Sequence, residues 1–215
     1  MRNWHFNHID FSTYPAYGKG DLGVSRTPEK TLFRLWAPTA RTVDLRLYTA
    51  GKGGKPLRII AMERAEGGTW LHEEPADLQG LYYTFRVHDG EWLHEVPDPY
   101  ARAVGVNGLR GMVIDLAATN PQGWEKDKGP RLKAFTDWII YETHIRDFSI
   151  SPCSGIHHKG KYLGFTEENT CNPTGEKTGL SYLKELGITH VHLLPVHDFQ
   201  TVDEEYPGLK YNWGY

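Results

Sequence analysis

The spacing of hydrophobic and polar residues divides the chain into two parts. Between residues 31 and 116 short runs alternate, as in "TVDLRLY", where Val43, Leu45 and Leu47 share one face. The same kind of run recurs in "TLFRLWAP", "LRIIAM", "GTWLHEE", "GLYYTFRV" and "MVIDL". Several short strands separated by turns predict an antiparallel, immunoglobulin-like β-sandwich over residues 18–118.

A turn signal lies inside this part. Asp89 and Gly90 separate "TFRVH" from "EWLHE", and both residue types tolerate the positive φ of a tight turn. The pair therefore predicts a β-hairpin with a two-residue loop.

The pattern changes after a Pro- and Gly-rich linker. "DWIIYETHIRDFS" is an apolar run of strand length, centred on residues 139–145. "GLSYLKELG" has helical spacing, with leucines at 180, 183 and 186 on one face and Gly187 as the stop. "ITHVHLLPV" is a second buried-strand candidate, so the run predicts a βαβ unit with two parallel strands.

The predicted fold class is therefore multidomain, a β-sandwich followed by the first part of an α/β domain. The predicted segments are an N-terminal extension (1–17), the sandwich (18–118), a linker (119–136) and the start of the α/β domain (137–215). A connection of roughly thirty residues (150–178) is longer than compact domains use, which indicates a functional or flexible loop.

Composition narrows the classes of partner. The 215 residues carry a net charge of −3 with a pI near 6.4, which argues against a nucleic-acid partner. No long apolar run occurs, so no membrane span is expected. Aromatic residues reach 13%, which suits stacking on sugars or other flat ligands. We expect a cytoplasmic protein, or a secreted one if a leader has been removed.

Cysteines and histidines do not indicate a metal site. Cys153 and Cys171 form either one disulfide or two free thiols. The His157-His158 pair and the alternating His190 and His192 lack the spacing of a zinc site, and for the alternating pair a buried structural role is expected. No cofactor is expected to be required, while calcium binding and the oligomeric state stay open.

Several of these stretches resemble known proteins. "FRLWAPTARTVDLRLY", "GLYYTFRV" and "DPYARAV" resemble the family-48 carbohydrate-binding module. "WIIYETHIRDFS", "GKYLGFTEE", "GLSYLKELGITHVHLLPVHDF" and especially "YNWGY" resemble the opening of the catalytic barrel of type I pullulanases, in glycoside hydrolase family 13. The resemblance implies hydrolysis of α-1,6 bonds with retention on a (β/α)8 barrel. The implied partners are α-glucans: pullulan, glycogen or amylopectin dextrins.

The resemblance also places a sugar-binding site. Active sites of such barrels lie at the C-terminal strand ends, here near residues 146–148 and 195–199, together with the loop at 160–168. The tyrosine that closes "YNWGY" stacks on the sugar at the cleavage subsite in the family. The expected substrate-binding residues are Tyr211, Asn212, Trp213, Tyr215, His197 and Asp198. His197 and Asp198 would either approach the substrate or support residues that do.

Catalytic carboxylates are not expected in this chain. A barrel takes about 250 residues, and the chain after Asp137 suffices for two strands and one helix. No residue matches the nucleophile, the acid or the third carboxylate of the family. For Glu142 and Asp147 packing, or pairing with Arg146, is the expected role. We therefore expect a fragment without hydrolytic activity of its own.

Two alternatives accompany this interpretation. One is a fragment of a glycogen branching or isoamylase-type enzyme, which shares the sandwich. The other is a non-catalytic glucan-binding module that uses sandwich aromatics. Trp36, Trp70 and Trp92 would then form a platform, although a role in the core, or packing against the barrel, is equally compatible with their positions.

Overall fold

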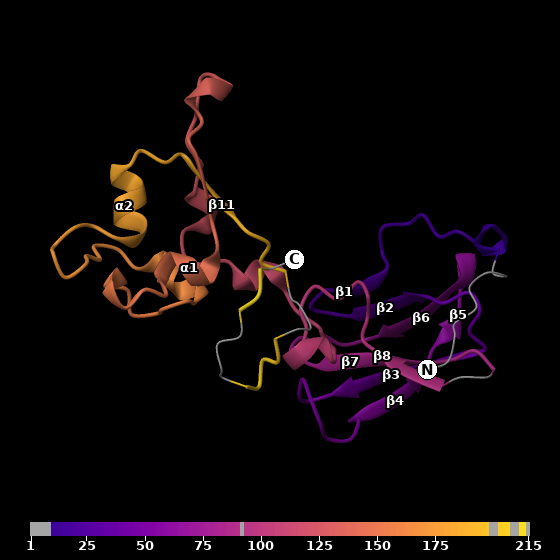
Figure 1. Ribbon diagram of the computed structural model, residues 1–215. Coiled ribbons are helices and arrows are strands. Elements are labelled where there is room, and N and C mark those ends of the chain that lie inside the picture. Colours follow the sequence, from indigo (N-terminus) through magenta and orange to yellow (C-terminus); the bar gives the residue numbers. More distant parts are fainter. Residues whose placement is uncertain (1–9, 91–92, 198–201, 207–210, 214–215) are drawn as a thin grey trace. The chain divides into compact units, whose positions relative to one another are not determined.

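The structure, a computed structural model, divides into two compact units (Figure 1). It describes residues 10–90, 93–197, 202–206 and 211–213. The first unit comprises residues 1–121 and 203–206, and the second comprises residues 122–202 and 207–215.

The first unit is built from two antiparallel sheets. One has the spatial order β1 (Gly23–Arg26), β2 (Thr31–Trp36), β6 (Thr69–Glu74) and β5 (Glu63–Arg64). The other has the order β4 (Arg58–Ala61), β3 (Thr42–Tyr48), β7 (Tyr82–His88) and β8 (Leu93–Val96), and β9 (Gly111–Met112) also pairs with β7. The predicted β-sandwich is thereby confirmed, with β1 and β5 as strands that the sequence pattern did not indicate.

The core of this unit lies between the two sheets. Val43, Leu45 and Leu47 of β3 are at most 1% exposed, as their alternation predicts. Phe33 of β2 and Trp70 of β6 join the same cluster from the other sheet. Burial of these side chains removes apolar surface from water, which is the main stabilising contribution to such a sandwich.

Two details of the predicted strands differ. β7 and β8 do form a hairpin at Asp89-Gly90, but the register pairs His88 with Leu93, so the connection is longer than a two-residue turn. In "MVIDL" only Met112 belongs to β9, and a 3-10 turn at Leu116–Thr119 follows. Asp115 caps that turn by accepting a hydrogen bond from the Ala117 N–H, and such local capping competes with strand pairing.

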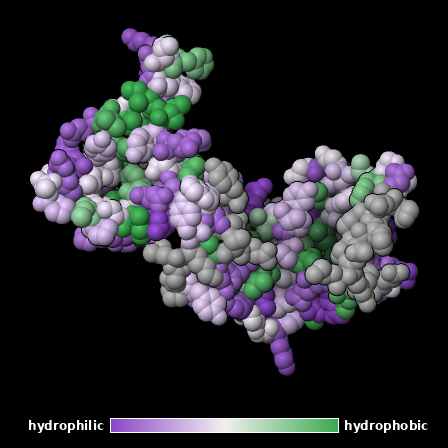
Figure 2. Space-filling view, viewed as in Figure 1, coloured by the Kyte–Doolittle hydropathy of each residue, from purple (hydrophilic) through white to green (hydrophobic). Residues whose placement is uncertain are grey.

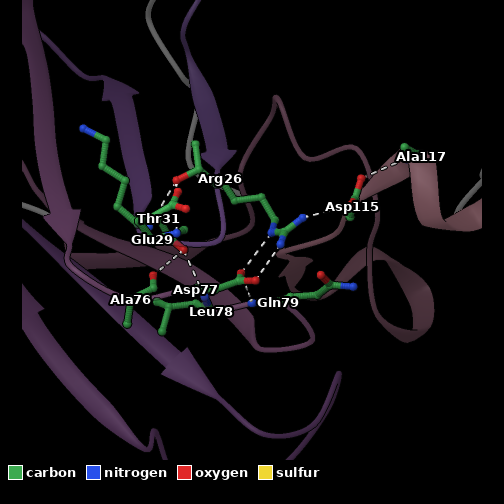
Figure 3. A network of polar contacts seen from close by, with 11 residues as sticks. Arg26, Glu29, Thr31, Ala76, Asp77, Leu78, Gln79, Asp115 and Ala117 are labelled. Atoms are coloured by element: carbon green, nitrogen blue, oxygen red, sulfur yellow. Dashed lines mark hydrogen bonds and ion pairs between the residues drawn. The ribbon is translucent and has the colours of Figure 1, made fainter.

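A polar network closes one end of the sandwich (Figure 3). The Arg26 guanidinium of β1 donates two hydrogen bonds to the Asp77 carboxylate and lies 3.1 Å from Asp115 Oδ2. Thr31 accepts a hydrogen bond from the Leu78 N–H (3.0 Å). The paired Arg26 holds the pKa of Asp77 below its usual range. This network fastens the β6–β7 connection to β1 and β2.

The second unit contains the predicted βαβ unit. β10 (Ile140–Thr143) runs parallel to β11 (His190–Leu193), and Ile140 pairs with His190. The helices are α1 (Ile145–Ser149) and α2 (Gly179–Glu185), and Gly187 follows α2 with φ 76° as the predicted stop.

The predictions for this unit were wrong in two respects. The first strand ends at Thr143 instead of near residues 146–148, because His144 is the N-cap residue of α1 and its carbonyl accepts the Phe148 N–H (3.0 Å). The second strand likewise ends at Leu193, before the predicted 195–199. The strands are also not buried: Ile140 is 58% exposed and Val191 is 40% exposed. A sheet of two strands has few neighbours to cover its faces, and Figure 2 shows hydrophobic side chains at the surface of this unit.

Short 3-10 turns account for much of the remaining chain. They lie at Phe11–Thr13, Glu66–Gly68, Val106–Gly108, Leu116–Thr119, Trp124–Lys126, Phe135–Asp137, Pro152–Ser154 and Tyr162–Thr166. Within the described residues, no helix has the length and apolar character needed to cross a membrane.

A core substitution tests the sandwich. Leu45→Ala removes a fully buried side chain and should lower the free energy of unfolding by about 3 kcal/mol, through lost burial and the cavity left behind. Ile59→Ala on neighbouring β4, where the side chain is 54% exposed, should cost about 0.5 kcal/mol. Urea denaturation followed by circular dichroism measures both, and equal losses would contradict this core.

Candidate functional site

Residues 211–213, called the aromatic segment below, pack against His144, which lies between β10 and α1. The ring centroids of Tyr211 and His144 lie 5.4 Å apart. His144 Nε2 lies 2.7 Å from the carbonyl oxygen of Asn212. Because a carbonyl only accepts, Nε2 carries the proton and donates it. The segment is therefore attached to the C-terminal end of β10 by its backbone as well as by a ring.

Charged groups surround the first ring of this segment. The Arg146 guanidinium lies 5.4 Å from the centre of the Tyr211 ring, a cation–π distance. Arg146 also donates a hydrogen bond to Asp147 Oδ1 (2.7 Å), as predicted for that carboxylate. Desolvation, followed by the nearby Asp147 charge, raises the pKa of the Tyr211 hydroxyl.

The second ring is available to a ligand. Trp213 meets Tyr211 edge-on, with centroids 4.9 Å apart and an interplanar angle of 86°. Trp213 is 59% exposed. An exposed indole held by an edge contact presents a flat apolar surface, to which the C–H face of a sugar ring can stack.

The predicted site residues divide into three groups. Tyr211, Asn212 and Trp213 are brought together with the end of β10. His197 is exposed beyond β11 and, within the described ranges, makes no hydrogen bond or ring contact with them. Asp198 and Tyr215 lie outside the described residues.

His144 was missed by the sequence reasoning. Its Nδ1 is buried and has no hydrogen-bond partner among the described residues, and Asp147 Oδ2 is 4.0 Å away. The predicted strand was expected to reach residues 146–148 and so included His144, which hid its position. In the structure His144 directly follows β10, at the sheet edge where active-site loops gather. Local patterns did not show that His144 is the N-cap residue of α1.

Two histidines of β11 differ in their surroundings. His190 stacks on Trp138, with centroids 4.6 Å apart, and its Nδ1 lies 2.9 Å from Thr189 Oγ1. The side chain of His192 is 65% exposed and lies 3.1 Å from Glu142 Oε2. The predicted buried role is therefore wrong for His192, because the face of β11 on which it lies is open. In the described part of the chain no three His, Cys, Asp or Glu residues are grouped as metal ligands.

Two side chains, the carboxylate of Glu167 and the hydroxyl of Ser149, accept backbone hydrogen bonds from the long connection after α1. The Glu167 carboxylate accepts hydrogen bonds from the backbone N–H groups of His157 and His158, both 2.8 Å. The buried Ser149 hydroxyl accepts the Gly160 N–H (2.7 Å). These bonds hold the loop against the end of α1, where the rings of Phe148 and Phe165 stack at 3.8 Å.

The structure also bears on two open alternatives: a disulfide or free thiols for the cysteines, and a glycan platform or a core role for the tryptophans. Cys153 and Cys171 are free and exposed. Trp70 is 6% exposed and belongs to the core, so it forms no glycan platform. Trp36 is 39% exposed and donates to the Pro15 carbonyl, and Trp92 lies outside the described residues.

The chain is similar to known proteins over most of its length. Residues 21–101 match the family model described as Carbohydrate-binding module 48 (Isoamylase N-terminal domain). The pullulanase of Bacillus subtilis (strain 168) is 44% identical over 202 residues, covering 93% of this chain and 27% of that protein. Pullulanase 1, chloroplastic, of Arabidopsis thaliana is 34% identical and is matched over 90% of this chain and 20% of its own length.

The solved structures give the same result. The crystal structure of apo pullulanase from Paenibacillus barengoltzii has a TM-score of 0.87 and 49% sequence identity, covering 92% of this chain and 31% of that chain. The pullulanase from Bacillus acidopullulyticus has a TM-score of 0.87 and 44% identity, covering 94% and 25% of the two chains. The chain spans about a quarter of the length of the curated relatives named above.

The Glu167 bonds predict a pH dependence of the long loop. Hydrogen bonds from the His157 and His158 backbone lower the pKa of Glu167 to about 2. Because the ordinary value of a glutamate is about 4.3, the carboxylate stabilises the folded loop fully above that pH, and this stabilisation is lost as the pH falls towards 2. NMR titration of the carboxyl carbon, with amide signals of both histidines, should show this transition.

A neighbouring glutamate supplies the control. Glu167→Gln should loosen the amides of His157 and His158 at every pH. Glu168→Gln removes a carboxylate that pairs with Lys184 and should leave those amides unchanged. A Glu167 titration near pH 4 would show that the loop is held in another way.

Proposed function

We propose that this chain, a homologue of the pullulanases over most of its length, forms the N-terminal part of a glycoside hydrolase that cleaves α-1,6 bonds in α-glucans. The observation that carries the proposal is the exposed Trp213 indole, held by Tyr211 at the C-terminal end of β10. Pullulan, glycogen or amylopectin dextrins are the proposed substrates.

The proposed ligand class has two independent supports. Residues 21–101 match a carbohydrate-binding module. Related pullulanase structures are described as complexes with maltohexaose and α-cyclodextrin, and with maltotriose. Both supports point to α-linked glucose chains, whose rings present C–H faces to aromatic side chains.

We further propose that residues 137–215 begin a (β/α)8 barrel. Parallel β10 and β11, joined through α2, are the repeating unit of such a barrel. The aromatic segment then lies on the side where barrel enzymes bind substrate. Tyr211, Asn212, Trp213 and Tyr215 are the proposed sugar-facing residues, with His197 and Asp198 near the second strand end.

The mechanism of this class requires two carboxyl groups about 5–5.5 Å apart for retention. Among the described residues at the strand ends, Asp147 is engaged by Arg146 and Glu142 by His192. We therefore assign neither Asp147 nor Glu142 the role of nucleophile or of acid. We propose that the 215 residues bind glucan and contribute no hydrolysis by themselves, and that no cofactor is required.

Sugar binding should depend on Trp213. Trp213→Ala removes the exposed stacking face and should weaken the binding of maltotriose about fivefold, since an aromatic contact contributes about 1 kcal/mol. Trp124→Ala is the matched control, because that indole is 56% exposed in the same unit. NMR titration of the chain measures both, and equal affinities of the two variants would contradict the proposed site.

Hydrolysis should require more chain than the 215 residues. The purified chain should release no reducing sugar from pullulan, whereas the whole product of its gene should release it. Activity of the chain alone would disprove its proposed inactivity. Inactivity of the whole gene product on pullulan, together with activity on another glucan, would favour a branching or isoamylase-type enzyme instead.

A further inference from the structure

A short acidic turn belongs to a different unit from its neighbours in the chain. Asp203–Tyr206 is part of the β-sandwich unit, whereas residues up to 202 and from 207 onward belong to the second unit. The turn is closed by the Tyr206 N–H, which donates to the Asp203 carbonyl (3.2 Å), and by the Glu205 N–H, which donates to Asp203 Oδ1 (3.1 Å). The sandwich must therefore hold this turn through specific contacts.

Asn107 makes three of those contacts. Its backbone N–H donates to Glu204 Oε2, its Nδ2 donates to Asp203 Oδ1, and its Oδ1 accepts the Glu204 N–H, each at 2.9 Å. Asn107 adopts φ 54°, a conformation in which its backbone and side chain face the same partner. Both donors and the acceptor of one residue thus meet a turn 96 positions away in the chain.

Lys52 adds a charge to the same site. Its ammonium forms an ion pair with the Glu205 carboxylate, and this hydrogen bond raises the pKa of Lys52. The two side chains are 48% and 42% exposed, so the pair contributes to orientation more than to stability. Among the described residues, the acidic turn is thus held by the ammonium of Lys52 and by the backbone and side-chain amides of Asn107.

The fold of the sandwich builds this site from two loops. Arg110 donates to the Ala50 carbonyl (2.6 Å) and the Gly53 carbonyl (2.7 Å), which fixes the loop that carries Lys52. Gly105, two residues before Asn107, approaches Gly51 so closely that a Cβ on it would lie 2.6 Å from the Gly51 Cα. Only glycine permits this approach. The glycines at 51 and 105 therefore allow the loop that carries Lys52 to lie against the loop that carries Asn107.

We propose that Asn107 and Lys52 are positioning residues, which anchor the Asp203–Tyr206 turn and thereby restrain the aromatic segment, which begins five residues after Tyr206. The part that concerns sugar rests on the proposed function. Holding the chain before Tyr211 removes conformational freedom from the segment, so less ordering entropy is lost when a glucan stacks on Trp213. A sandwich residue that touches no sugar then contributes to sugar affinity.

Chemical cross-linking tests the anchor without any sugar. A water-soluble carbodiimide joins an ion-paired lysine and carboxylate as an amide, and peptide mass spectrometry of the 215-residue chain should detect Lys52 joined to Glu205. Lys30–Glu73 is the matched positive control, since it is an ion pair at 3.0 Å with both side chains 49% exposed. Formation of the control link without the Lys52–Glu205 link would overturn the proposal.

Variants test the coupling to the aromatic segment. Asn107→Gly keeps the positive φ and removes both amide contacts, so hydrogen exchange at 203–206 should accelerate about fivefold for each hydrogen bond lost, and maltotriose affinity should fall severalfold. Lys52→Met should have a smaller effect that disappears in about 1 M salt, because exposed ion pairs are screened. Asn169→Gly, at φ 59° in the other unit, is the control that should change neither.

The outcomes separate this proposal from the proposed function. An unchanged urea midpoint of the sandwich in Asn107→Gly, with weaker maltotriose binding, supports positioning. Loss of binding in Trp213→Ala but full binding in Asn107→Gly overturns the positioning role of Asn107 and leaves the proposed function intact. Absence of maltotriose binding in the wild-type chain counts against the proposed function, and cross-linking and exchange then still decide the anchor.

Discussion

The packing around the Tyr83 ring is the constraint on which the first unit depends. Tyr83 is fully buried, and its ring meets Phe33 of the opposite sheet with centroids 5.1 Å apart. Its hydroxyl donates to the buried Asp98 carboxylate (2.6 Å), whose pKa burial raises. Gly111 of β9 lies over the same ring, where a Cβ would come within 2.8 Å of it. One side chain thus joins two sheets, the segment after β8, and β9.

This packing also positions the turn that carries Asn107. Because Gly111 fixes β9 beside β7, the chain just before it is held as the turn Val106–Gly108, which carries Asn107. Asn107 in turn binds the acidic turn from which the chain continues to Tyr211. The second unit has no comparable core, since Leu183 and Ile156 are its buried large hydrophobic residues among those described. Its site is consequently held by individual polar and ring contacts, such as that of His144 with Asn212.

A feature of the fold or the site could be predicted from sequence where it depends on residues that are close together in the chain. The alternation in β3 and the spacing of α2 are local, and both elements were predicted from sequence. The end of β10 and the exposure of His192 depend on capping and on what covers the sheet, which a local pattern does not contain. The aromatic segment was singled out through its resemblance to a family, not by periodicity. Asn107 gave no signal at all, because its partners lie 96 and 97 positions away.

Under the proposed function, the described contacts at the end of β10 suit the binding of a sugar more than the cleavage of a glycosidic bond. Trp213 and Tyr211 offer apolar faces, and Arg146 offers a cation already engaged by Asp147. The Asp147 carboxylate accepts a hydrogen bond from Arg146, and a carboxylate used as an acceptor suits the orientation of a sugar hydroxyl. Glycosidic cleavage needs an acid whose pKa is raised by its surroundings. Asp147 is paired instead with the cation of Arg146, so we propose recognition, and not acid catalysis, as the role of this end of β10.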